Sequence, residues 1–126
     1  MRWVILVKNF KMLCLLSDIK EGKSNIIKTK YNDSEVEIII LRDKNILNGF
    51  VNICPHASLP LNLNDTNVLY NDNFHLICRN HAALFNPLNG ICVSGPCEGK
   101  SLEIVKLKIK CDKVYIKRKQ GFSYDR

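Results

Sequence analysis

Short apolar runs rich in β-branched residues, separated by polar turn residues, set the hydrophobic pattern of this 126-residue chain. Glu35–Leu41 has the composition of a strand, Arg42–Asn45 that of a turn, and Ile46–Ile53 that of the returning strand. Over Leu102–Ile109, apolar and polar residues alternate as on a strand with one face in solvent. No stretch has the roughly 3.6-residue period of a long helix. The pattern therefore predicts an all-β protein, built as a sandwich or a small barrel.

Two further hairpins are predicted where turn residues separate short apolar runs. Val68–Tyr70 and Phe74–Ile77 flank the turn residues Asn71–Asn73. Near the C-terminus, Cys111–Lys113 precedes the returning strand Val114–Ile116. The chain is thus a series of short strands with frequent turns, and its sequence contains no internal repeat.

Length and composition fit one soluble domain spanning residues 1–126, with 46% hydrophobic and 25% charged residues. The apolar start, Met1–Val7, is too short to span a membrane and lacks a signal-peptide cleavage site. Met12 is an alternative start, which would make residues 1–11 an upstream extension. We therefore expect a cytoplasmic protein without a membrane partner, whose six cysteines are metal ligands or buried thiols rather than disulfides.

The formal net charge of +7 is unevenly distributed. Between positions 52 and 97 the only charged residues are Asp65, Asp72 and Arg79, so the positive charge lies in the N-terminal third and after position 99. A basic C-terminal region is one feature of nucleic-acid-binding proteins. Here its lysines at 106, 108 and 110 alternate with apolar residues, as on the solvent face of a strand, and no base-stacking aromatic residues lie among them. We therefore expect no nucleic-acid partner.

Two short motifs each combine one cysteine with one histidine. The first is Cys54-Pro55-His56, and the second places Cys78 three residues before His81. Two such loops folded against each other can hold two irons, with both thiolates on one iron and both imidazoles on the other, which is the ligand set of a Rieske [2Fe–2S] centre. Pro55 stiffens the first loop by fixing its own φ angle, which lowers the entropy lost on metal binding.

Other readings of the same residues remain open at this point. The same four ligands can hold a structural zinc ion, although zinc sites more often use Cys-x-x-Cys, which is absent here. A four-thiolate site built from Cys54, Cys78, Cys92 and Cys97 would leave both histidines without a role. Cys92 and Cys97 can instead form a disulfide, against which a reducing compartment argues.

Three further residues are expected to have no part in metal binding. Cys14 and Cys111 are predicted to be small buried hydrophobic residues. His75 lies in the predicted hairpin and is expected to be a cross-strand surface residue.

The order of these features resembles a Rieske ferredoxin domain over roughly residues 13–117. Leu13–Gly22 resembles the opening strand and turn of that family, and Asn86–Gly90 resembles the turn that follows its second motif. The third loop, Ser94-Gly95-Pro96, would pack its backbone closely over the cluster. The resemblance implies a Rieske-type iron–sulfur fold: an antiparallel β-sandwich base with a small cluster-binding lobe at about residues 52–97.

The resemblance also assigns one [2Fe–2S] cluster to the ligands Cys54, His56, Cys78 and His81. The chain departs from the family pattern in two ways. Glycine usually follows each histidine closely, whereas Ser58 and Ala82–Ala83 stand here, and the 21 residues between His56 and Cys78 are more than in many members. Neither departure removes a ligand.

No nucleotide-binding glycine fingerprint or mononuclear iron triad accompanies the motifs. A chain whose one redox centre moves single electrons is a carrier rather than a complete enzyme. We therefore expect a soluble one-electron carrier that passes electrons from a reductase to a terminal oxygenase or another oxidoreductase. The alternatives are a small subunit of a larger oxidoreductase, as in nitrite-reductase small-subunit relatives, and a zinc-binding interaction module.

The resemblance further implies a low cluster potential. High-potential Rieske proteins of respiratory complexes have a serine two residues and a tyrosine four residues after the second histidine, and both hydroxyls donate hydrogen bonds at the cluster. Those positions are Ala83 and Phe85 here, and neither side chain can donate.

Overall fold

The computed structural model describes residues 9–31, 34–55, 60–62, 75–78 and 83–117. Its strands, in chain order, are β1 (Phe10–Leu15), β2 (Ser24–Tyr31), β3 (Ser34–Asp43), β4 (Ile46–Val51), β5 (Leu76–Cys78), β6 (Ala83–Phe85), β7 (Cys92–Ser94), β8 (Ile104–Val105), β9 (Leu107–Lys110) and β10 (Lys113–Lys117). The one helix among the described residues is a 3₁₀ turn, η1 (Leu16–Asp18). Within the same residues, no helix has the length and apolar character needed to cross a membrane.

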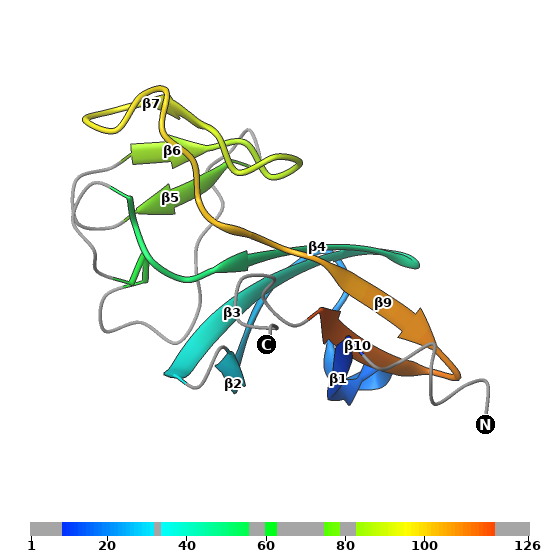
Figure 1. Ribbon diagram of the computed structural model, residues 1–126. Helices are drawn as coiled ribbons and strands as arrows, with labels where there is room; N and C mark the ends of the chain where they lie inside the picture. The colour runs from blue at the N-terminus through cyan, green and yellow to red at the C-terminus, as the bar shows by residue number, and fades with distance from the viewer. Residues whose placement is uncertain (1–8, 32–33, 56–59, 63–74, 79–82, 118–126) are drawn as a thin grey trace.

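The strands form three antiparallel sheets, as Figure 1 shows. The first has the order β1-β10-β9 and the second the order β2-β3-β4-β8, and together they make the base of the molecule. The third, β5-β6-β7, stands at one end of the base, and we call it the lobe sheet. Every pairing is antiparallel, which confirms the predicted all-β, antiparallel fold class.

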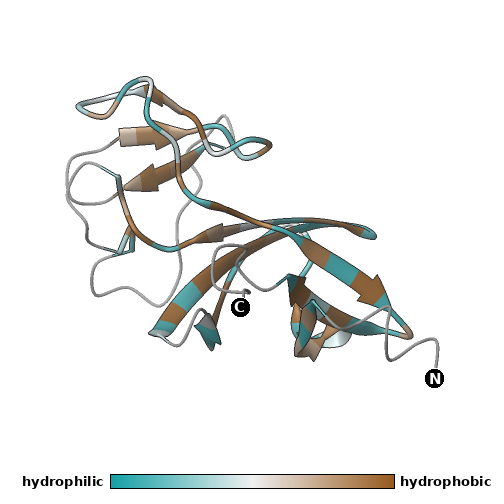
Figure 2. Ribbon diagram, viewed as in Figure 1, coloured by the Kyte–Doolittle hydropathy of each residue, from teal (hydrophilic) through white to brown (hydrophobic). Residues whose placement is uncertain are grey.

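Strand β3 separates two hydrophobic cores. Its residues Ile38 and Ile40 pack with Val114 and Ile116 of the first sheet, whereas the alternate residues pack toward the lobe sheet. Successive side chains of a strand point to opposite faces, and all four residues from 38 to 41 are at most 5% exposed. Residues 38–41 are therefore apolar at every position because both faces of the strand are covered there, whereas the first half of β3 alternates in hydropathy, as its banded colours in Figure 2 show.

The predicted single strand over Leu102–Ile109 is wrong in one respect. It divides at Lys106 into β8, which pairs with β4, and β9, which pairs with β10. The carbonyl of Lys106 accepts a hydrogen bond from the Lys117 amide at 2.9 Å, and the chain passes here from one base sheet to the other. Alternation alone could not reveal the division, because Val105 before the break and Leu107 after it pack in the same core, so the alternation continues across it.

Other sequence predictions have mixed outcomes. The turn at Cys111–Lys113 is confirmed, but Cys111 itself is exposed and not buried. Cys111 and Asp112 both have positive φ angles, 51° and 62°, so the turn geometry places the Cys111 side chain outside the core.

Strand β2 was not predicted, although its Ile26 and Ile27 pack against the two cores. Most of the hairpin predicted around Asn71–Asn73 lies outside the described residues.

Candidate metal centre

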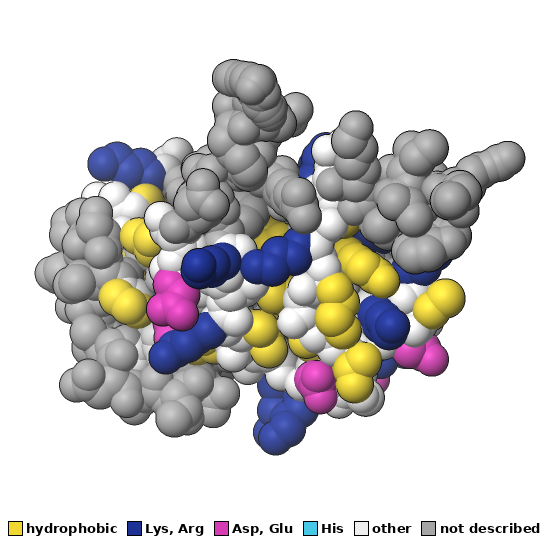
Figure 3. Space-filling view, turned by 60° about the horizontal axis from the view of Figure 1, so that its bottom comes forward, with side chains coloured by type: hydrophobic (Ala, Val, Ile, Leu, Met, Phe, Trp, Pro, Cys, Tyr) yellow, Lys and Arg dark blue, Asp and Glu magenta, His cyan; other side chains and the backbone are white. Residues whose placement is uncertain are grey.

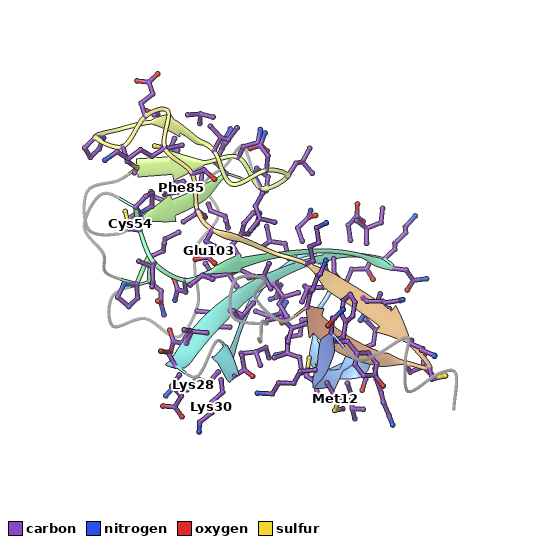
Figure 4. All side chains as sticks on the ribbon, viewed as in Figure 1. Met12, Lys28, Lys30, Cys54, Phe85 and Glu103 are labelled. Atoms are coloured by element: carbon purple, nitrogen blue, oxygen red, sulfur yellow. The ribbon has the colours of Figure 1, made fainter. Side chains whose placement is uncertain are left out.

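The two motif cysteines lie where strands end next to the lobe sheet. Cys54 follows β4 by three residues, and Cys78 is the last residue of β5. Both side chains are fully buried and belong to one apolar cluster that includes Leu61 and Phe85. Figure 4 shows Cys54 beneath the lobe sheet that carries Phe85. His56 and His81 lie outside the described residues.

The second motif occupies the connection between two paired strands. Cys78 of β5 is directly opposite Ala83 of β6, and the pairing continues through Ile77 with Leu84 and Leu76 with Phe85. Only positions 79–82, which include His81, separate the paired ends of the hairpin. The sheet therefore fixes where the second motif begins and where the chain re-enters β6.

A buried side chain that the sequence analysis missed holds the two ends of the first motif loop together. The Asn52 Oδ1 accepts a hydrogen bond from the Leu61 amide at 2.9 Å, and its Nδ2 donates to Asn62 Oδ1 at 3.0 Å and to Glu37 Oε1 at 3.1 Å. Asn52 is 3% exposed. Since Asn52 and Leu61 flank the segment that contains Cys54, one amide group ties the two ends of the first motif loop together. A single asparagine before a cysteine carries no recognisable sequence signal.

The third loop packs closely against the second motif. A Cβ atom added to Gly95 would lie 2.8 Å from the Cα of Ala83, and the φ angle of Gly95 is +105°. Glycine meets both requirements, because it has no Cβ and tolerates positive φ. The close packing predicted for Ser94-Gly95-Pro96 is thus present, directed at the first residue described after the second motif.

The turn between β6 and β7 holds the lobe sheet against the base. The Asn86 carbonyl accepts from the Gly90 amide at 2.7 Å, and the Asn86 Oδ1 accepts from the Leu88 amide at 2.7 Å. A Cβ on Gly90 would lie 2.9 Å from the Phe50 ring, so only glycine fits between this turn and strand β4. The turn expected at Asn86–Gly90 is confirmed by this hydrogen bonding.

Two further cysteines lie in the same cluster. The Cys97 thiol donates to Cys92 Sγ at 3.0 Å, and the Cys92 thiol donates to the Ser94 carbonyl at 3.2 Å. Burial, followed by the hydrogen bond to Cys92 and the proximity of Cys54, raises the pKa of Cys97 to about 12. No disulfide links any of the described cysteines.

The two remaining residues considered in the sequence lie at the margins. Cys14 is only partly buried, and burial and the nearby Asp18 carboxylate raise the pKa of its thiol. His75 is partly buried just before β5, so the expected surface position is correct only in part.

The arrangement suits a metal centre with thiolate ligands. Metal binding removes the thiol proton, and the positive metal compensates a thiolate that would be unfavourable alone in an apolar cluster. Within the described residues, no group of three or more Cys, His, Asp or Glu side chains is placed to hold a metal ion. The structure therefore gives no support to the four-thiolate alternative, and a centre at Cys54 and Cys78 needs ligands from elsewhere in the chain.

Most of the described basic residues lie on the base. Figure 3 looks at the face of the base and shows lysine and arginine side chains distributed across it among hydrophobic ones. Lys28 and Lys30 lie opposite Glu37 and Glu35 in the β2–β3 pairing, and Figure 4 shows both lysines at the edge of the base below the lobe sheet. Lys28 also lines a pocket with Ile53 and Pro60, beside the first motif. The lysines at 106 and 108 are exposed and that at 110 is partly buried, so the predicted solvent face is largely confirmed.

Comparisons with known proteins point to one family. The model of the Rieske [2Fe-2S] domain matches residues 9–111, whereas no curated protein matches the sequence. The fold is similar to the ferredoxin of carbazole 1,9a-dioxygenase from Nocardioides aromaticivorans IC177, with a TM-score of 0.69, 16% identity, and coverage of 88% of this chain and 99% of that chain.

Two other solved structures have the same fold. A chain from the complex of reduced oxygenase and oxidized ferredoxin in carbazole 1,9a-dioxygenase has a TM-score of 0.67 at 21% identity, covering 89% of this chain and 96% of that one. The terminal oxygenase of carbazole 1,9a-dioxygenase from Novosphingobium sp. KA1 has a TM-score of 0.70 at 14% identity, covering 90% of this chain and 31% of that one. With the family match extending over most of its length, this chain belongs to the Rieske [2Fe–2S] domain family.

Proposed function

We propose that this chain is a one-electron carrier whose [2Fe–2S] cluster is held by Cys54, His56, Cys78 and His81. Family membership implies one such cluster. The observation that carries the ligand assignment is the burial of two thiols in one cluster, each at the end of a strand or its following loop and each followed in sequence by a histidine. When bound, a centre with these ligands takes up and gives up one electron at a potential between roughly −150 and +300 mV.

The protein's own residues hold and shield the ligands. Leu61, Phe85 and Leu102 are at most 1% exposed in the cluster around the two thiols and exclude water from them. Asn52 holds the two ends of the first motif loop, and the pairing of Cys78 with Ala83 holds those of the second. Ligands held this way need little reorganisation when the charge of the centre changes, which favours rapid electron transfer.

The proposed partners are an electron-donating reductase and an electron-accepting oxygenase. Support comes from the similar ferredoxin that is found in a complex with an oxygenase. Support also comes from the surface near the thiols, where Ile53 is 46% exposed, Val93 is 42% exposed, and Pro60 and Pro96 are exposed. We expect docking there to rely on apolar and polar contacts, through Leu59, Pro60, Leu84 and Pro96.

The ligand assignment is tested by spectroscopy on the purified protein. We expect iron and acid-labile sulfide in equal amounts, a red-brown colour and a Rieske EPR signal. Replacing any one of Cys54, His56, Cys78 and His81 with alanine should abolish the signal, because each iron needs both of its protein ligands. Cys14→Ala and Cys111→Ala are matched controls, since both remove a thiol outside the apolar cluster that surrounds Cys54 and Cys78.

Two outcomes would contradict the proposal. A colourless protein containing zinc would favour the zinc-module alternative, and a Rieske signal retained in His56→Ala or His81→Ala would refute the ligand set. Native mass separates a free carrier from a subunit, because a subunit would co-purify with a larger oxidoreductase.

A further inference from the structure

A pair of thiols outside the proposed ligand set lies next to it. Cys92 and Cys97 have their sulfur atoms 3.0 Å apart, and their side chains are 2% and 1% exposed. A disulfide bond is about 2.05 Å long. The two sulfurs therefore need to approach by only about 1 Å to be covalently joined.

The backbone of the third loop sets this approach. The amide of Cys92 donates to the Lys100 carbonyl at 2.7 Å, the amide of Gly99 donates to the Cys92 carbonyl at 3.2 Å, and the amide of Lys100 donates to the Cys97 carbonyl at 2.8 Å. These bonds fold the segment after Cys97 back along β7. Cys97 is thereby held opposite Cys92, and the pairing of the thiols is a consequence of the loop and not of a flexible encounter.

Cys97 also reaches the first motif. Its thiol donates to Cys92, and Cys54 lies close enough to contribute, after burial and Cys92, to the raised pKa of Cys97. A cysteine that ligates iron has no thiol proton, so in the loaded protein a hydrogen bond between the two sulfurs needs the single proton of Cys97, turned from Cys92 to Cys54. A donor to a ligand sulfur stabilises the more negative, reduced form of the centre and raises its potential.

We propose that Cys92 and Cys97 form a reversible dithiol–disulfide pair, and that closing the disulfide lowers the potential of the neighbouring cluster by removing the Cys97 thiol donor from Cys54. The second half of this proposal rests on the proposed function, whereas the first half does not. Such a coupling would let the thiol redox state of the surroundings set how readily this carrier accepts an electron.

The oxidant of the proposed step is a low-molecular-weight disulfide, such as oxidised glutathione. One protein thiol, as thiolate, attacks it, and one glutathione leaves as thiol. The second protein thiol then displaces the second glutathione, so the Cys92–Cys97 bond forms while the glutathione disulfide breaks. Two electrons and two protons pass from the protein to two molecules of glutathione.

The loop offers a route to the buried sulfurs. Residues 93–96, which connect the two cysteines, are all exposed, and Val93 is 42% exposed. A local opening of this turn brings the thiols to solvent without disrupting the base sheets.

The first experiment equilibrates the purified protein with defined ratios of reduced to oxidised glutathione. Cysteines are then alkylated and the protein is analysed by peptide mass spectrometry. We expect a Cys92–Cys97 cross-link that forms and reverses with the ratio, with the loss of two alkylatable thiols per chain. The cross-link should be absent from Cys92→Ser and present in Cys14→Ser and Cys111→Ser. Failure of the wild type to form it at any ratio would overturn the proposal, whether or not the chain carries a cluster.

The second experiment measures the cluster potential by voltammetry in the dithiol and disulfide forms. We expect the wild-type potential to fall on oxidation and to recover on reduction. Cys97→Ala should have a low potential that no longer responds, whereas Cys97→Ser, which keeps a donor but cannot close the disulfide, should have a high potential that does not respond. Equal potentials for the two forms of the wild type would overturn the coupling even if the disulfide forms. A chain without iron would refute the proposed function alone, since the first experiment would still decide the thiol pair.

Discussion

At the scale of single residues, the side chains that support the proposed ligands are as informative as the ligands themselves. Asn52 uses one amide group to make three side-chain hydrogen bonds, to Leu61, Asn62 and Glu37. A buried polar group whose partner is removed costs about 1–3 kcal/mol. The first motif loop therefore depends on a residue that never touches metal.

Replacing Asn52 with alanine tests this dependence. We expect the free energy of unfolding to fall by about 1–3 kcal/mol, because the Leu61 amide loses its buried acceptor. We also expect faster loss of iron to a chelator, since the ends of the first motif loop separate more easily. Asn25→Ala is a matched control: Asn25 also makes several hydrogen bonds with its amide group, but on the base, at the start of β2. Equal rates of iron loss in the two variants would show that Asn52 acts only on global stability.

A second prediction at this scale concerns the cluster potential and two residues of β6. Ala83 and Phe85 are both fully buried, and neither side chain has a hydrogen-bond donor. The Cys97 thiol is a weaker donor than a hydroxyl. We therefore expect a potential at the low end of the Rieske range, and an increase in Ala83→Ser with Phe85→Tyr, because hydrogen bonds to charged groups contribute roughly 1.5–3 kcal/mol.

Voltammetry on wild type and variant measures this change. Leu84→Ser is the matched control, because Leu84 lies between these residues on β6 and its side chain points to the opposite, partly exposed face. A wild-type potential near the top of the range, or an intact double variant without an upward shift, would show that the missing hydroxyls do not set the potential.

At the scale of elements, the loops of the lobe owe their positions to close backbone packing. Gly90 lies against Phe50, and Gly95 lies against Ala83. Gly99, in the same loop as Gly95, also has a positive φ angle, +90°, but has no atom within 4 Å of the place where a Cβ would lie. The two glycines therefore separate the effect of backbone conformation from that of packing.

Comparing Gly95→Ala with Gly99→Ala exploits this difference. Both variants incur strain from a positive φ, of order 1–3 kcal/mol. Only Gly95→Ala adds a contact 2.8 Å from the Ala83 backbone, which cannot move like a flexible side chain. We expect the Gly95 variant to have the lower urea midpoint and the broader, weaker EPR signal. Identical midpoints and spectra would mean that the third loop is free to withdraw from the second motif.

At the scale of the whole molecule, charge and the proposed centre are segregated. The net charge is +7, yet the described residues from Asn52 to Cys97 carry no formal charge. Charged surfaces steer encounters over about a Debye length, roughly 8 Å at physiological ionic strength. The basic base can therefore accelerate encounter with an acidic partner, while exposed apolar residues near the thiols, such as Ile53 and Val93, make the final contact.

Salt dependence of electron transfer measures this steering. We expect the second-order rate with an acidic partner to fall as salt is added, and neutralising Lys117, Arg118 and Lys119 with glutamine should weaken the dependence. Replacing the two lysines with arginine is the charge-preserving control and should leave the dependence unchanged. A rate that does not vary with salt would exclude steering.

The sequence by itself determined the fold class and the likeness to the Rieske family. Strand alternation is a local property, and two Cys/His motifs at fixed spacing are read directly from the chain. The turn at Asn86–Gly90 and the close packing of Gly95 were likewise predictable, since glycine and asparagine at turns have a specific conformational cause.

Only the tertiary structure decided which distant residues meet. The break at Lys106, the clamp made by Asn52, and the approach of Cys97 to both Cys92 and Cys54 depend on contacts between segments that alternation and motif spacing do not relate. The exposure of Cys111 depended on its positive φ, which its residue type does not favour. Local patterns reveal which faces of each strand are apolar, whereas the identity of what covers those faces is fixed only when the sheets pack together.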